Sequence, residues 1–288
     1  MNTTPLVIKT ERKSMLIRPS GRSSDFITPS FDFGCLAQCT YCYLKRHKES
    51  GVNIATNEHG IVNSVIRHHK KLPSKVANQT HPTKWTYDVG CNHDVALQWK
   101  YHNYPKIFSK LISYDIFPTF ATKYVNNKLL EYNPKQQARI RFSLMPQVIS
   151  SVVEPNTSLI TDRIKAINEF TKAGWDVHIN FSPIIIHKNW LTNYTALFTE
   201  INDTVEDKDK VLAECIFLTH NVKKHEANLK VNAEAESLLW VPKFQESKTS
   251  QYGEENIRYE VGFKRKAIYS FTNLHDSIIP WNKIRYIF

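Results

Sequence analysis

The sequence predicts an α/β protein, a partial (β/α)6 barrel of the TIM type with a small C-terminal extension. Its length of 288 residues suits one barrel-type domain. Hydrophobic residues make up 41% of the chain, which is enough for a sizeable core and does not suggest disorder. From residue 27 onward, short apolar runs alternate with helical patterns, as is typical of βα units and of a mostly parallel sheet.

Six apolar runs of strand length are expected to form that sheet. They are Ile27–Phe33, Lys84–Val89, Phe117–Thr122, Ile140–Leu144, Val177–Ile185 and Ala213–Leu218. Because helical patterns separate these runs, we expect the sheet to curl into a barrel that stays open on one side.

The clearest helix pattern covers Thr161–Ala173. Thr161 is suited to cap its start, and Gly174 is suited to end it. Its apolar stripe consists of Ile164, Ile167 and Phe170. Two further helices are expected at Val95–Leu111 and Trp190–Ile201.

The chain divides into three expected parts. Residues 1–26 form a basic lead-in, 27–221 the barrel, and 222–288 an extension in which Arg258–Phe271 and Ile284–Phe288 are expected as terminal strands or a hairpin. The first 20 residues have no signal-peptide core, and no apolar run reaches the length of a membrane span. We therefore expect a soluble, cytoplasmic protein.

The charge favours an anionic partner. The net charge is +11, from 38 basic and 27 acidic residues, and phosphate contacts by Lys and Arg dominate nucleic-acid affinity. The alternative is a basic surface that only aids solubility. Neither GxGxxG nor GxxxxGK[ST] occurs among the eight glycines, which excludes the common dinucleotide and ATP loops.

Three of the five cysteines fall within eight residues, in the CxxxCxxC pattern Cys35, Cys39 and Cys42. Such clustering in an intracellular chain indicates metal binding or catalysis rather than disulfides. Three thiolates on one loop can hold three corners of an iron–sulfur cube and leave the fourth iron open. The alternative is a zinc site with His47 as the fourth ligand. Cys215, inside an apolar run, is interpreted as a core residue.

The CxxxCxxC pattern after a predicted strand resembles the signature of the radical S-adenosylmethionine superfamily. The loop Gly34–Leu44 is more specifically similar to the cluster loop of the spore photoproduct lyase family. Further segments resemble that family in the same order: Tyr87–Asp94, Phe120–Lys123, Ala138–Ser143 and Glu154–Ser158. The resemblance implies a radical S-adenosylmethionine half barrel. It also implies a [4Fe–4S] cluster on the three cysteines, with S-adenosylmethionine chelated to the open iron.

The resemblance also implies roles for five other residues. Cys91 matches the cysteine that donates a hydrogen atom, although a lone cysteine at a strand end is more often a buried packing residue. Tyr41 and Tyr43 match tyrosines that return a hydrogen atom to that thiol, with Tyr43 favoured over Tyr41. Lys123 and Ser143 are expected to hold the carboxylate or ribose of S-adenosylmethionine.

The implied function is a carbon–carbon lyase that reverses a thymine-dimer lesion in DNA with a 5′-deoxyadenosyl radical. Its partners would be DNA or another nucleobase-containing substrate and an electron donor of the flavodoxin or ferredoxin type. Two alternatives stay open, and Asn92 and His93, which depart from the family pattern beside Cys91, keep the first of them open. One is a radical enzyme acting on another modified nucleobase, such as an isomerase in DNA hypermodification. The other is a zinc-stabilised nucleic-acid-binding protein.

Overall fold

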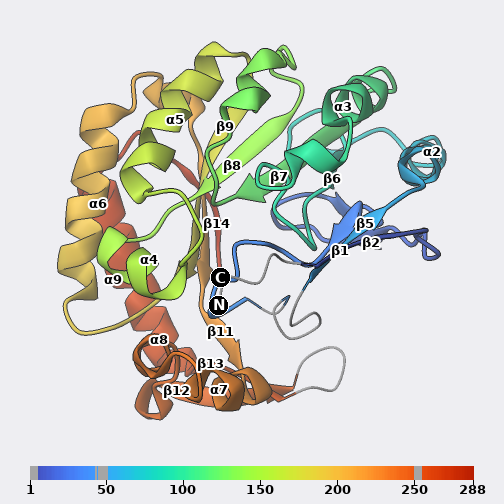
Figure 1. Ribbon diagram of the computed structural model, residues 1–288. Helices are drawn as coiled ribbons and strands as arrows, with labels where there is room; N and C mark the ends of the chain where they lie inside the picture. Colours follow the sequence, from blue (N-terminus) through green and yellow to red (C-terminus); the bar gives the residue numbers. More distant parts are fainter. Residues whose placement is uncertain (1–5, 43, 45–50, 250–254) are drawn as a thin grey trace.

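An eight-stranded sheet, curled into a half barrel, forms the centre of the molecule (Figure 1). The structure is a computed structural model, and it describes residues 6–42, 44, 51–249 and 255–288. In spatial order the strands are β14 (Ile284–Ile287), β10 (Ala213–Phe217), β9 (Asp176–Ile184), β8 (Arg139–Ser143), β7 (Phe117–Thr122), β6 (Thr86–Asp88), β3 (Phe26–Ile27) and β2 (Arg18–Pro19). Only β2 and β3 pair antiparallel in this sheet; every other neighbouring pair is parallel. The prediction of a partial α/β barrel is confirmed.

The predicted strand Ile27–Phe33 is wrong as one strand. Strand β3 ends at Ile27, two residues before Pro29, which has no backbone N–H to donate to a neighbouring strand. The chain then turns into a second sheet, where β4 (Asp32–Phe33) and β1 (Leu6–Thr10) flank β5 (Gly51–Ala55). The other five predicted runs each overlap one strand of the barrel, within about two residues at either end.

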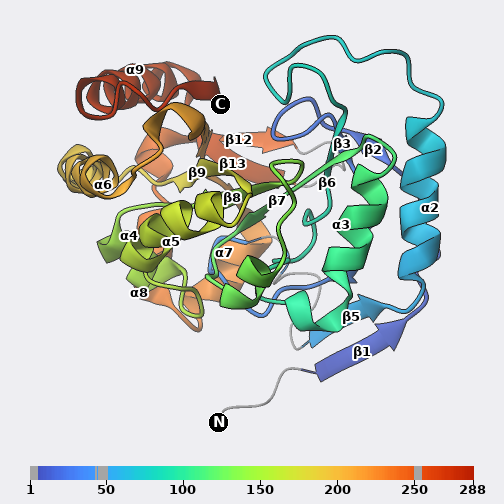
Figure 2. The same ribbon diagram turned by 90° about the horizontal axis from the view of Figure 1, so that it is seen from above.

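Helices cover the outside of the curled sheet. They are α2 (Glu58–His69), α3 (Tyr104–Ile112), α4 (Gln147–Val153), α5 (Ile160–Lys172), α6 (Trp190–Thr204) and α9 (Val261–Ile278). Short 3₁₀ turns lie at η1 (Trp99–Tyr101), η2 (Asn127–Glu131), η3 (Lys208–Lys210) and η4 (Pro242–Phe244). Figure 2 shows α2 and α3 beside one end of the sheet and α5, α6 and α9 beside the other.

Two predicted helix boundaries are corrected. Val95–Leu111 is not one helix, because Asn103 caps a new one: its side chain accepts a hydrogen bond from the backbone N–H of Lys106. Thr161 does not cap α5, since Leu159 holds that position and the Gln147 side chain accepts from the N–H of Ile160. A long side chain from another helix thus does the work of a local cap.

After the barrel strands, the chain forms a small antiparallel sheet of its own. Strands β11 (Thr219–Asn221), β13 (Glu255–Tyr259) and β12 (Gln245–Thr249) form an antiparallel sheet, accompanied by α7 (Val222–Leu229) and α8 (Ala233–Leu239). From Val261 the chain returns to the barrel, so the expectation of strands over Arg258–Phe271 is wrong beyond Tyr259. Helix α9 packs on α6, and β14 adds a parallel strand to β10 (Figure 1).

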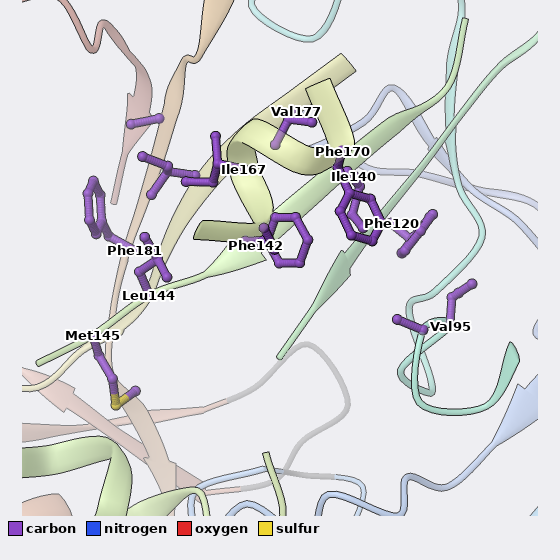
Figure 3. Packing of buried hydrophobic residues seen from close by; sticks show 14 of the residues in the cluster. Val95, Phe120, Ile140, Phe142, Leu144, Met145, Ile167, Phe170, Val177 and Phe181 are labelled. Carbon is purple, nitrogen blue, oxygen red and sulfur yellow. The ribbon is translucent and has the colours of Figure 1, made fainter. Parts of the chain in front are cut away.

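The two faces of each barrel strand differ, because successive side chains point to opposite sides. On the outer face of β8, Phe142 packs on Phe170 of α5 with ring centroids 5.2 Å apart (Figure 3). On the inner face, Arg141 crosses the barrel to Asp88 of β6 at 2.6 Å and Glu214 of β10 at 3.1 Å. Charged residues therefore fill part of the interior and hold the curl of the sheet.

A buried histidine joins the small sheet to α2. His102 lies 2.6 Å from Asp32 and 2.8 Å from Glu58, and its side chain is 2% exposed. Burial alone lowers the pKa of this imidazole, but hydrogen bonds and charge from the two carboxylates outweigh burial and raise the pKa above 6.5.

None of the helices that the structure describes is both long enough and apolar enough to cross a bilayer.

His102→Leu is expected to lower the free energy of unfolding by about 3 kcal/mol at pH 6 and by less at pH 8.5, because Asp32 loses its buried partner. A raised folded-state pKa gives stability that is complete below the unfolded pKa and declines as the pH rises through the folded pKa. Urea denaturation at both pH values measures the difference. His59→Leu, at an exposed histidine of α2, is the control. An equal loss at the two pH values would contradict the assignment.

Candidate active site

The residues that the sequence singles out gather at the carboxyl edge of the parallel sheet. Cys91 follows the end of β6, Lys123 follows β7, and Ser143 is the last residue of β8. Strand register keeps these ends near one another, since Asp88 at the end of β6 pairs with Thr119, and Thr122 at the end of β7 pairs with Phe142 of β8. This edge is where barrel active sites lie.

The loop that carries the cysteines is fixed to the barrel at both ends. Gly34 has φ of 102° and donates its N–H to the carbonyl of Asn92 at 3.1 Å. A Cβ at this position would lie 2.7 Å from the carbonyl oxygen of Gly51, so only glycine fits. Farther along, the N–H of Thr40 donates to the carbonyl of Val153 at the end of α4, at 2.8 Å.

The three thiols lie close enough for their charges to act on one another. Burial and the charge of Asp94 raise the pKa of Cys35 to about 12, although N–H groups of Ala37 and Asp94 donate to its sulfur. Burial and the charge of Glu154 raise the pKa of Cys39 well above its usual range, while the charge of Lys123 acts in the opposite direction. Cluster assembly must therefore displace protons.

This donor set fits an iron–sulfur cluster. Three thiols on one anchored loop, with backbone N–H groups directed at a sulfur, are the groups that such clusters use. Within residues 6–42, 44, 51–249 and 255–288, no three His, Cys, Asp or Glu side chains converge as they would around a single ion. A [4Fe–4S] cube does not need such convergence, because each cysteine binds a different iron of the cube. His47, the proposed zinc ligand, lies outside the described residues, as does Tyr43.

A buried carboxylate, Glu154, connects the cysteine loop to the barrel. Its oxygens accept hydrogen bonds from the Tyr41 hydroxyl, from Arg163 at 2.9 Å and from Ser150 at 3.1 Å, and Lys123 lies 3.7 Å away. Burial alone raises the pKa of this carboxyl, but the charges of Lys123 and Arg163 and the hydrogen bonds outweigh burial and lower it. The role of Glu154 was not predicted from the sequence, because nothing near a single Glu shows which distant residues it contacts.

Lys123 and Ser143 differ in accessibility. The Lys123 ammonium lies 3.3 Å from the carbonyl of Ser182 and 5.8 Å from the centre of the Tyr41 ring, so it sits beside the cysteine loop. The Ser143 side chain is buried, and its hydroxyl accepts a hydrogen bond from the Asn180 amide at 3.3 Å. Lys123 is the more open of the two candidates for cofactor binding.

Cys91 is partly buried at the mouth of the barrel. Its sulfur lies 3.7 Å from a guanidinium nitrogen of Arg18, a contact that the sequence does not foretell because Arg18 belongs to the basic lead-in. The preceding Gly90 donates its N–H to Asp88 at 2.8 Å, which fixes the tight turn after β6.

The residues after Cys91 belong to the framework. Asn92 donates its side-chain N–H to the hydroxyl of Ser30, and His93 is buried with its ring nitrogen 2.8 Å from the Tyr104 hydroxyl. Asp94 accepts hydrogen bonds from the Thr122 hydroxyl at 2.7 Å and from the N–H of Lys123 at 2.8 Å. These side chains shape the loop between β6 and β7.

A half barrel with a three-cysteine loop at its carboxyl edge defines the radical S-adenosylmethionine class of proteins. The family model described as spore photoproduct lyase matches residues 2–288, so the chain belongs to the spore photoproduct lyase family. The matches favour neither the isomerase nor the zinc-stabilised alternative.

Relatives and solved structures agree with this family. Spore photoproduct lyase of Bacillus subtilis (strain 168) is 26% identical over 196 residues, which cover 66% of this chain and 55% of the relative. That of Clostridium acetobutylicum is 26% identical over 213 residues, or 69% of this chain and 61% of the relative. The chain thus matches less than two thirds of the length of either one.

Two solved structures show the same fold. A spore photoproduct lyase mutant with dinucleoside spore photoproduct superposes with a TM-score of 0.86 at 18% identity, covering 98% of this chain and 82% of the other. A double mutant with bound AdoMet and the same dinucleoside gives 0.85 at 17% identity, with the same coverage.

Glu154→Gln is expected to lower the free energy of unfolding by about 3 to 5 kcal/mol, because the buried Arg163 guanidinium loses its counter-charge. Glu206→Gln is the control: it removes a carboxylate from an exposed pair, with Lys172 2.8 Å away. Its expected cost is below about 1 kcal/mol. Urea denaturation measures both variants. Similar losses in the two would show that the Glu154 network does not depend on charge.

Proposed function

We propose that this chain is a radical S-adenosylmethionine lyase that repairs spore photoproduct, a thymine-dimer lesion, in DNA. The observation that carries the proposal is the placement of Cys91 and the three-cysteine loop at one carboxyl edge of a half barrel, in a chain of this family. The names of the relatives and the dinucleoside in the superposed structures support the choice of substrate.

Cys35, Cys39 and Cys42 would hold a [4Fe–4S] cluster, and its open iron would take S-adenosylmethionine. Lys123, whose ammonium lies beside Tyr41 and Glu154, would bind the carboxylate of that cofactor, with Ser143 near the ribose. When bound, the reduced cluster and S-adenosylmethionine supply the one-electron cleavage that begins hydrogen abstraction from the lesion.

The chain's own residues would complete the repair. Once the bridge between the two thymines has broken, the Cys91 thiol gives a hydrogen atom to the thymine radical, because its S–H bond is weaker than the C–H bond that forms. The sulfur radical then takes a hydrogen atom back from a tyrosine hydroxyl, that of Tyr43 or Tyr41. Of the two tyrosines, Tyr41 lies within the described residues, and its hydroxyl donates a hydrogen bond to Glu154.

DNA is the proposed macromolecular partner. Burial and the nearby charges of Arg258, Lys248 and Arg22 lower the pKa of Lys264. Four cations from β12, β13, α9 and the N-terminal lead-in therefore lie close together. Such a cluster suits phosphate binding, and the net charge of +11 supports it. The two bases must leave the stack to reach the barrel mouth. The one-electron donor would be a flavodoxin or ferredoxin, and the setting cytoplasmic.

An anaerobic assay tests this function. Iron-reconstituted protein is mixed with dithionite, S-adenosylmethionine and a spore-photoproduct dinucleotide, and 5′-deoxyadenosine and thymine are followed together. We expect both products. Formation of 5′-deoxyadenosine without thymine would support the radical chemistry but rule out this substrate. A finding that the protein carries only zinc would rule out both.

Cys91→Ala is expected to keep 5′-deoxyadenosine formation and to lower the yield of restored thymine by about tenfold or more, because the thymine radical loses its hydrogen donor. Cys215→Ala, at a buried cysteine of β10, is the control and should retain repair. Full repair by the Cys91 variant would remove Cys91 from the mechanism.

A further inference from the structure

Helix α7 of the extension reaches across to the cysteine loop with two buried side chains. The Lys224 ammonium donates hydrogen bonds to the backbone carbonyls of Cys42 and Cys39, the latter at 3.5 Å. The Asn228 amide donates to the carbonyl of Thr40 at 3.0 Å. Lys224 is 4% exposed and Asn228 2%, so both contacts exclude water.

The two side chains are themselves held in place. Asn221 caps α7 by accepting from the N–H of Lys224 at 3.3 Å. Asn228 donates a second hydrogen bond to the Glu236 carboxylate at 2.7 Å. Glu236 also lies 2.7 Å from His220 and 2.8 Å from a ring nitrogen of His225. A network inside the extension therefore fixes the direction from which α7 approaches the loop.

The charge of Lys224 affects the cluster itself, in addition to the hydrogen bonds that hold the loop. A buried cation beside two cluster ligands stabilises whichever oxidation state carries more negative charge, and that state is the reduced one. The same loop is tied on its other side to the barrel, through the N–H of Thr40 and the carbonyl of Val153. The loop backbone is thus held from both sides, and α7 supplies the positive side.

We propose that Lys224 and Asn228 are positioning residues that hold the backbone of the cluster loop, and that the Lys224 charge raises the reduction potential of the cluster. The proposal rests on the proposed [4Fe–4S] function. It gives the extension a task at the cluster that is separate from any contact with DNA. Loss of the charge makes the cluster harder to reduce by the same donor.

The test compares Lys224→Met with Lys223→Met, which removes an exposed lysine from the same helix. Iron content and an EPR-monitored redox titration are measured on each reconstituted protein. At a fixed potential, Lys224→Met is expected to lower the ratio of reduced to oxidised cluster by about tenfold, which corresponds to 59 mV for a one-electron couple. Lys223→Met should match the unaltered chain, and Lys224→Arg, which keeps the charge, should stay close to it.

A normal iron content with an unchanged potential in Lys224→Met overturns the proposal. A folded Lys224→Met that fails to retain iron while Lys223→Met does supports the positioning role. If Lys224→Met does not fold, Asn228→Ser decides: a broadened EPR signal or reduced iron supports the proposal, and an unchanged cluster overturns it. Failure of the unaltered chain to assemble any cluster would instead reject the proposed function.

Discussion

The buried carboxylate of Glu154 is the constraint on which the site depends. A fully buried charge is tolerated only when it is paired and hydrogen-bonded, so each partner of Glu154 must stay in place. Arg163 brings α5, Lys123 brings the end of β7, and Tyr41 brings the cysteine loop. Three elements distant in sequence are thereby held together at the carboxyl edge of the sheet.

The cysteine loop is held by two different kinds of structure. The barrel side uses backbone contacts, at Gly34 and Thr40, which depend on the close approach of main chains. The extension side uses long buried side chains, above all Lys224. Backbone contacts fix the path of the loop, whereas the ammonium adds a charge. This arrangement suits a redox centre, because Lys224 adds a charge to a loop whose path the backbone contacts already restrict.

Local patterns predicted much of the fold and the centre of the site. The run Phe117–Thr122 is β7 to the residue, and the cysteine spacing located the loop, since both signals are contained in a few adjacent residues. Non-local features escaped prediction. Strand β14 pairs with β10 across about seventy residues, and part of α9, which packs on α6, was mistaken for a strand. The buried contact of Lys224 with the cysteine loop could not be predicted, because a lysine in a polar helix is ordinarily exposed.

We propose that the three cysteines hold a cluster with one open iron, to which S-adenosylmethionine binds. The most direct test is the EPR spectrum of the reduced, reconstituted protein before and after addition of S-adenosylmethionine. A changed spectrum is predicted, because a new ligand at one iron alters the electronic symmetry of the cluster. A [4Fe–4S] signal that stays the same at saturating cofactor would contradict the account.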